Sequence, residues 1–227
     1  MPITPTRILK IPKKRRCLYF DGVDDYVEVP DNANLHLNSL SVEVVFKPNT
    51  TPDDDTLILK YLYPDYAGWY IRLSSTDFII RLLDDNGNLE TLGWTYTFET
   101  GKWYHFVANI STTSAEPFIN ASSLGSQSYT TITGNIYSSI PLYIASYNGS
   151  SSFFNTDIAL VRIYNRALSP EEINASYHNG LHRLYHNFTS LEDGTYHYRA
   201  FAIDANGNMN KTDWRILTIA APPVITI

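Results

Sequence analysis

The chain has 227 residues, of which 44% are hydrophobic and 18% are charged, and its formal net charge is −6. No apolar run approaches the roughly 18 residues that a membrane-spanning helix needs, and the negative charge argues against nucleic acid as a partner of the whole chain. Seventeen tyrosines, ten phenylalanines and four tryptophans favour strands over helices. The length suits one β-domain and part of a second.

The chain opens with a basic arm, residues 1–16, which ends in Lys13-Lys14-Arg15-Arg16. Two interpretations are open: a solvated arm, or a segment that binds anions such as nucleic acid or acidic glycans. The arm contains no apolar stretch of signal-peptide length. An extracellular protein with this beginning would be an excised piece of a longer secreted protein or a virion component.

The next stretch, Cys17 to Pro30, reads CLYFDGVDDYVEVP. Leu18–Phe20 and Tyr26–Val29 are short apolar runs on either side of an acidic turn. Gly22 can adopt a positive φ at little cost, so we expect the chain to reverse there and the two runs to pair as a hairpin. Cys17 is the only cysteine, which excludes an internal disulfide, and we expect it to be buried as a small hydrophobe.

Alternating apolar and polar residues then predict strands along most of the chain. The segment Asn86-Gly87 is a strong hairpin signal between two of them. The spacing of about 10 to 15 residues, with no interleaved helices, fits an antiparallel sandwich. The further strands are expected at 40–47, 56–61, 69–74, 77–83, 89–95, 103–110, 116–120, 129–132, 141–146 and 157–164.

One helix is predicted after the last of these strands. Ser169 is a suitable N-cap, Pro170 suits the first helical position, and Glu172 completes a capping box. Leu168 and Ile173 occupy the positions of a hydrophobic staple. Asn179-Gly180 ends the helix.

Three motifs resemble those of laminin-G-like, concanavalin A-like lectin/glucanase domains: YFDGVDDYVEVP, KWYHFVANI and LVRIYNRALSPEEI. The resemblance covers about residues 17–178. It implies an all-β, two-sheet antiparallel jelly-roll sandwich, with one short C-terminal helix, over residues 17–180. Such domains often read Gly-x-Ile-Asp-Glu-Val before Arg-Ile-Tyr, whereas this chain has Ala159 and Leu160 in place of the two acids.

Residues 181–220 form a different module, with strands expected at 194–203 and 213–219. They resemble the C-terminal half of immunoglobulin-like or fibronectin-like repeats in prokaryotic surface proteins. Two or three strands cannot bury a core alone, so this partial module needs a partner. Residues 221–227 are interpreted as a linker or as a strand donated to a neighbour.

The resemblance raises the question of hydrolysis, for which glucanases on this scaffold use carboxylates on one strand in a Glu-x-Asp pattern. No Glu-x-Asp pair occurs in the chain. Glu43 is expected to face outward from its strand alone. The six histidines show no HExxH pattern, and Gly180 between His178 and His182 argues against a two-His metal site. We therefore predict that the protein is not an enzyme and has no catalytic residues.

Calcium is the predicted inorganic ligand, because related domains often hold Ca²⁺ at the rim of the sandwich through carboxylates and carbonyls. Asp21, Asp24 and Asp25 form the matching acidic turn, with Asp157 near them in the prediction. The alternative is that these aspartates stabilise the turn by Asx hydrogen bonds. The run from Asp84 to Asn88 also looks like a calcium loop, but a hairpin turn explains it better.

Sugar binding requires an aromatic platform with polar groups nearby, and the segment around residues 61–69 offers both. The predicted ligand-binding residues are Tyr63, Asp65, Tyr66, Trp69, Tyr147 and Asn148. We interpret the protein as a non-catalytic extracellular binding or adhesion module that contacts glycan or a surface protein. The alternative is a structural subunit of a filament, sheath or virion fibre, which assembles through its terminal strands.

Seven N-x-S/T sequons suggest a glycosylated surface protein, the alternative being an unmodified chain rich in Ser, Thr and Asn. One of them, at Asn109, lies within a predicted strand and is not expected to be modified. The predicted glycosylation sites are Asn49, Asn120, Asn148, Asn174, Asn187 and Asn210.

Overall fold

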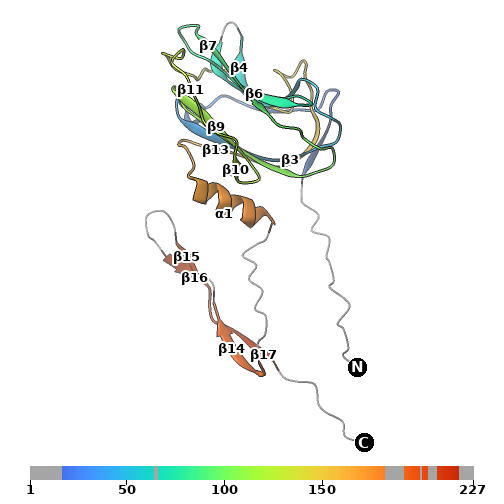
Figure 1. Ribbon diagram of the computed structural model, residues 1–227, viewed down its shortest axis with the longest axis vertical. Helices are drawn as coiled ribbons and strands as arrows, with labels where there is room; N and C mark the ends of the chain where they lie inside the picture. The colour runs from blue at the N-terminus through green and yellow to red at the C-terminus, as the bar shows by residue number, and fades with distance from the viewer. Residues whose placement is uncertain (1–16, 64–65, 182–191, 200, 204–208, 220–227) are drawn as a thin grey trace, which may run out of the picture. The chain divides into compact units, whose positions relative to one another are not determined.

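A computed structural model describes residues 17–63, 66–181, 192–199, 201–203 and 209–219 (Figure 1). The chain divides into two compact units, residues 1–181 and 182–227, which are described separately. None of the helices among the described residues is long and apolar enough to cross a membrane.

The first unit is a sandwich of two antiparallel sheets, one with seven strands and one with six, which confirms the predicted jelly-roll architecture. The seven-stranded sheet has the order β1 (Leu18–Asp21), β13 (Asn155–Tyr164), β3 (Leu40–Pro48), β8 (Tyr104–Ile110), β9 (Ser114–Ile119) and β10 (Ser122–Ser123), and β11 (Gln127–Ser128) also pairs with β9. The six-stranded sheet has the order β2 (Val27–Val29), β12 (Leu142–Ile144), β4 (Asp55–Leu62), β5 (Tyr66–Leu73), β6 (Asp77–Leu83) and β7 (Leu89–Thr95). A short 3₁₀ helix, η1 (Ala33–Leu35), follows β2.

The expected first hairpin is wrong, because β1 and β2 belong to different sheets. β1 pairs with β13, and β2 pairs with β12. Gly22 does adopt a positive φ of 80°, so the turn forms as expected. The turn nevertheless carries the chain from one layer to the other, because the pairing partners lie far along the sequence.

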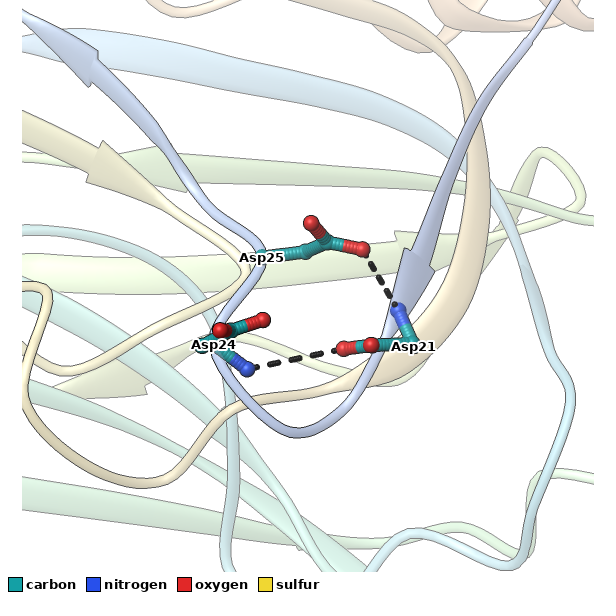
Figure 2. A group of neighbouring side chains, drawn as sticks. All are labelled: Asp21, Asp24 and Asp25. Atoms are coloured by element: carbon teal, nitrogen blue, oxygen red, sulfur yellow. Dashed lines mark hydrogen bonds between the residues drawn. The ribbon is translucent and has the colours of Figure 1, made fainter.

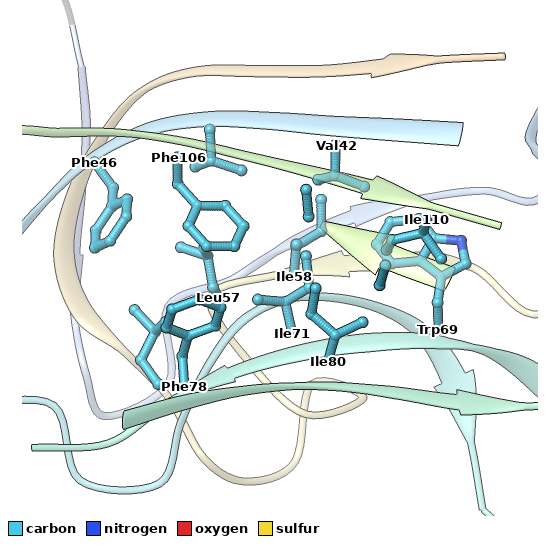
Figure 3. Packing of buried hydrophobic residues seen from close by; sticks show 14 of the residues in the cluster. Val42, Phe46, Leu57, Ile58, Trp69, Ile71, Phe78, Ile80, Phe106 and Ile110 are labelled. Atoms are coloured by element: carbon cyan, nitrogen blue, oxygen red, sulfur yellow. The ribbon is translucent and has the colours of Figure 1, made fainter. Parts of the chain in front are cut away.

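The space between the two sheets is filled by one hydrophobic core (Figure 3). Strand alternation directs Val42, Phe46 and Phe106 inward from the seven-stranded sheet, where they meet Ile58 and Phe78 of the six-stranded sheet. Every one of these five side chains is fully buried. Burial of this apolar surface is the main force that holds the two sheets together.

The outer face of the seven-stranded sheet carries the helix α1 (Pro170–Leu181), as Figure 1 shows. The predicted capping box forms: the Glu172 N–H donates to Ser169 Oγ at 3.3 Å, and the Ser169 N–H donates to Glu172 Oε2 at 2.9 Å. Leu168 and Ile173 pack with Val107 and Phe118 of the sheet. The helix therefore begins where the sequence predicts, and its apolar side covers β8 and β9.

Two smaller expectations are also wrong. Residues 129–132 form no strand, because Tyr129 and Ile132 reach the core from a loop. Cys17 is exposed just before β1, so it does not behave as a buried hydrophobe.

The described residues of the second unit form two separate strand pairs. The strand expected over 194–203 is divided into β14 (Gly194–Tyr198) and β15 (Phe201–Ile203). β14 pairs with β17 (Arg215–Ile219), and β15 pairs with β16 (Met209–Lys211). The resemblance of this unit to an immunoglobulin-like module stays a prediction.

Candidate ligand-binding site

The outer face of the six-stranded sheet carries a row of residues that cross it from strand to strand. In register, Leu59 lies beside Tyr70, Tyr70 beside Arg81, and Arg81 beside Thr91. The neighbouring row, which includes Ile71, points into the core. Since successive side chains of a strand alternate between faces, the first row must point away from the core. We call it the outer row.

A loop, residues 145–153, folds back over this outer face. The Tyr147 N–H donates to the Ser151 carbonyl at 2.8 Å, and the Thr56 N–H donates to the Ser152 carbonyl at 3.0 Å. The second of these bonds fastens the loop to the β4 strand. The Tyr147 ring meets the Tyr70 ring edge-on, with centroids 5.6 Å apart.

The backbone of this region is strained. Ala145, Asn148 and Ser152 of the loop have positive φ values of 64°, 55° and 46°, and Asp54, just before β4, has a φ of 62°. Non-glycine residues adopt this conformation rarely, and such strain is concentrated at functional sites. The surrounding contacts hold these four residues in place at some cost in stability.

Part of the outer row, its neighbours and the loop line an open pocket of about 290 Å³, which we call the ligand cavity. Its wall contains two arginines, one aspartate, two tyrosines and two serines. They are Asp54, Tyr70, Arg72, Arg81, Tyr147, Ser151 and Ser152. Arg72 is ion-paired with Asp54. Tyr70 is 4% exposed, so the half-buried Tyr147 supplies most of the accessible aromatic surface of this wall. An aromatic surface beside hydroxyl and charged groups is what sugar recognition needs.

Tyr70 in the cavity wall and Tyr61 beside it are held in their neutral form by burial. Burial raises the pKa of Tyr70. Burial also raises the pKa of Tyr61 to about 12, although the positive charge of Arg81 acts in the opposite direction. Tyr61 stacks on Tyr70 with ring centroids 5.9 Å apart, so the two rings form a rigid aromatic base.

The predicted ligand-binding residues are brought together only in part. Tyr147 lines the ligand cavity, and Asn148 lies next to it in the strained loop. Tyr63 is 56% exposed at the turn after β4 and is outside the cavity wall. Trp69 is 1% exposed and belongs to the core, which removes it from any surface platform. Asp65 lies outside the described residues, and of Tyr66 only the backbone, in β5, is described.

Sequence reasoning missed Tyr70, Arg72 and Arg81. The strand pattern contains a signal for the first two, because Ala67, Trp69 and their alternate neighbours form the apolar side of β5. Tyr70 and Arg72 lie on the opposite side, which carries the polar groups. Arg81 could not be added from sequence, because its position beside Tyr70 depends on the register of β5 against β6.

The acidic turn after β1 brings three carboxylates together (Figure 2). One oxygen from each of Asp21, Asp24 and Asp25 lies within 4.8 Å of the others. Asp21 Oδ1 accepts the Val23 N–H at 2.8 Å, and Asp25 Oδ2 accepts the Asp21 N–H at 3.1 Å. The turn thus forms the predicted Asx bonds and also presents oxygen atoms of the type that Ca²⁺ prefers.

Asp157 does not join this acidic turn. Its carboxylate pairs with Lys47 Nζ at 2.6 Å and accepts a hydrogen bond from Asn49 Nδ2 at 3.2 Å. A calcium ion at the turn would therefore have three aspartates as side-chain ligands, rather than four.

Glu43 does not face outward alone, as the sequence suggested, because α1 covers its side of the sheet. Its carboxylate is fully buried and accepts hydrogen bonds from His105 Nε2 at 2.8 Å, from Tyr164 Oη at 2.7 Å and from Ser176 Oγ of the helix. Burial alone would raise the pKa of Glu43, but these bonds lower it to about 2. The ionised Glu43 carboxylate therefore connects the seven-stranded sheet to α1 through its hydrogen bonds.

Asp84 confirms the interpretation of the Asp84–Asn88 run as a hairpin turn. Its buried carboxylate accepts the N–H groups of Asn88, Thr133 and Gly134 at 2.7–2.8 Å and the Asn88 side-chain amide at 2.9 Å. These bonds hold the pKa of Asp84 well below its usual range, although burial opposes them. A carboxylate so fully committed to N–H donors has little capacity left for a metal ion.

The sequons occupy varied environments. The side chain of Asn109 donates to the Leu168 carbonyl at 2.9 Å and accepts from Ser41 Oγ at 2.5 Å, which ties it into the fold. Asn174 is exposed on α1, whereas Asn187 lies outside the described residues. Glycosylation at the six predicted sites stays a prediction.

Comparison with known families identifies the fold. The profile of the Laminin_G_3 family, described as the concanavalin A-like lectin/glucanases superfamily, matches residues 21–174. The chain belongs to this family, and the predicted resemblance is confirmed for the first unit. Comparison of the sequence with curated proteins gave no match.

Solved structures with the same fold include the following three, two of which are described as binding domains. One is the HCR/D W1238A mutant, with 18% identity and a TM-score of 0.59 over 72% of this chain and 42% of that one. Another is the binding domain of Paraclostridial Mosquitocidal Protein 1, with 14% identity and a TM-score of 0.58 over 85% and 53%. A third is the binding domain of botulinum neurotoxin DC in complex with SialylT, with 16% identity and a TM-score of 0.55 over 68% and 39%. The chain thus spans about half of these structures or less.

Proposed function

We propose that the protein is a non-catalytic, extracellular binding module that recognises a glycan in the ligand cavity on the outer face of the six-stranded sheet. The observation that carries the proposal is that Tyr70, Tyr147 and Arg81 line one cavity. The loop that carries Tyr147 has a strained backbone and is hydrogen-bonded to β4. Rigid aromatic walls bind sugar faces at a low cost in conformational entropy. The toxin binding domains of the same fold are consistent with this role, although their low identity supports the fold alone.

The same wall supports the proposal that the protein is not catalytic. Glycoside hydrolysis uses two carboxyl groups that flank the scissile bond. Among the described residues that line the ligand cavity, Asp54 is the only carboxylate, and it is paired with Arg72. We therefore expect no release of reducing sugar from any glycan that the protein binds.

The test is a glycan array followed by titration of the best ligand against the Tyr147→Ala variant. Loss of one aromatic wall is expected to weaken binding about 10-fold, equivalent to about 1.4 kcal/mol. Tyr63→Ala is the matched control, because this exposed tyrosine lies outside the cavity wall, and it should bind normally. Unchanged binding by a folded Tyr147→Ala variant, as judged by its thermal midpoint, would refute this site.

We also propose that Asp21, Asp24 and Asp25 bind Ca²⁺, which would brace the turn between the two sheets. If so, about 1 mM Ca²⁺ should raise the thermal midpoint by about 3–5 °C, since a ligand at roughly ten times its Kd stabilises by about 1.4 kcal/mol. EDTA should reverse the shift, and Asp24→Asn should abolish it. An equal midpoint with Ca²⁺ and with EDTA would leave the aspartates as turn-forming residues only.

The second candidate function is that of a structural subunit that assembles through its strands. The observation in its favour is the apolar surface of the second unit, where Trp214, Ile216 and Leu217 are exposed. A neighbouring copy that adds a strand would cover such a surface. The mass of the protein in dilute solution separates the two functions, because assembly requires large oligomers and a binding module does not.

A further inference from the structure

The two arginines of the ligand cavity differ in their partners. Arg72 Nη1 is paired with the carboxylate of Asp54. Arg81 Nε donates to Thr91 Oγ1 at 3.1 Å, and within the described part of the chain no carboxylate lies within salt-bridge distance of it. The cavity wall therefore carries one positive charge that the protein does not compensate.

The groups around Arg81 do not supply that compensation. Tyr70 faces it from β5, Thr91 faces it from β7, and Tyr61 lies near enough for its pKa to respond to the arginine charge. Burial raises the pKa of both tyrosines, so their hydroxyl groups stay neutral. A half-buried guanidinium among neutral tyrosines is incompletely solvated, and an anion from outside would relieve this.

The geometry of the guanidinium indicates which anion. Arg81 Nε donates to Thr91 and the guanidinium also interacts with the Tyr61 side chain, and its remaining N–H groups can pair with the two oxygens of a carboxylate. The Tyr147 ring in the same wall suits a sugar face, and the serine hydroxyls of the loop suit sugar hydroxyl groups.

We propose that the ligand cavity selects a glycan that carries a carboxylate, as uronic and sialic acids do, and that Arg81 binds this carboxylate. The inference rests on the proposed function, because it names the ligand class of the same site. Neutral sugars would contact the aromatic wall alone and bind more weakly.

The test compares immobilised tetragalacturonate with its methyl ester, and sialyllactose with lactose, with sulfated lactose as a further probe. Wild-type protein should bind at least one carboxylated probe 10- to 100-fold more tightly than its neutral counterpart, as expected for a charge-assisted hydrogen-bonded pair. Arg81→Gln should remove that difference and keep the residual affinity for the neutral probe. Lys102→Gln is the control for charge, since exposed Lys102 lies outside the cavity wall.

Each result has one meaning. Equal affinity for carboxylated and neutral probes, with Arg81→Gln unchanged and Tyr147→Ala impaired, overturns the acidic ligand and leaves the glycan site intact. Tighter binding of sulfated lactose than of either carboxylated probe overturns the carboxylate in favour of sulfate. Binding that neither Arg81→Gln nor Tyr147→Ala alters overturns the site itself, and absence of binding to both carboxylated probes overturns the inference.

Discussion

Replacing Glu43 by alanine is expected to lower the free energy of unfolding by about 3 kcal/mol, because the hydrogen bonds that this buried carboxylate accepts are lost together. The loss has two sources. His105, buried beside the carboxylate, would lose its partner, and Ser176 would no longer hold α1 to the sheet. Chemical denaturation followed by circular dichroism measures the change.

Glu28→Ala is the matched control, because this glutamate is exposed on β2, and it should change stability by less than about 0.5 kcal/mol. His105→Ala should cost much less in the Glu43→Ala background than in the wild type, because the two residues share one interaction. Fully additive losses would show that the Glu43–His105 pair does not act as a unit.

The same carboxylate predicts how stability depends on pH. The folded-state pKa of Glu43 is about 2, below its ordinary value of 4.5. A group with a lowered pKa contributes stability above its ordinary pKa and loses it as the pH falls toward the folded value. The excess stability of wild type over Glu43→Gln should therefore be constant above about pH 5 and shrink between pH 4.5 and 2.

Replacing Asp84 by alanine is expected to cost about 4 kcal/mol, because several buried N–H groups would lose a charged acceptor at once. The carboxylate joins the β6–β7 hairpin to Thr133 and Gly134, so both segments would lose order together. Hydrogen exchange should show loss of protection at these amides, beyond the change in denaturation midpoint.

The neighbouring residue offers the control for this variant. Asp85 is exposed, and among the described residues its carboxylate bonds only to Asn135, through two contacts of 2.8 and 2.7 Å. Asp85→Ala should cost about 1 kcal/mol. If the Asp84 and Asp85 variants proved equally stable, the proposed role of the buried carboxylate would be wrong.

Features that depend on a few adjacent residues could be predicted from the sequence. The capping box of Ser169 and Glu172 and the Asn86-Gly87 turn are local, and both form as expected. Gly22 adopts the expected positive φ for the same reason. The partners of the strands on either side of Gly22 could not be predicted, because they are chosen by contacts with distant segments.

The candidate site shows the same limit. Alternation places Glu43 on the face of β3 opposite the core, but only the packing of α1 shows that this face is buried. Likewise, the density of aromatic residues suggested Trp69 as a ligand-binding residue. Side chains alternate along β5, however, so Trp69 points into the core and its neighbour Tyr70 points to the other face. The register that joins Arg81 to Tyr70 and the loop that carries Tyr147 are tertiary features.

β1 and β2 pair with distant strands rather than with each other, and this affects how the protein can fold during its synthesis. β1 pairs with β13 and β2 pairs with β12, and both partners are synthesised much later than β1 and β2. β3 also pairs with β13. Such long-range pairing gives a high contact order, so neither sheet can be completed while the chain is still short on the ribosome. The segment from β1 to β2 must therefore stay soluble without its native partners until β12 and β13 have been made.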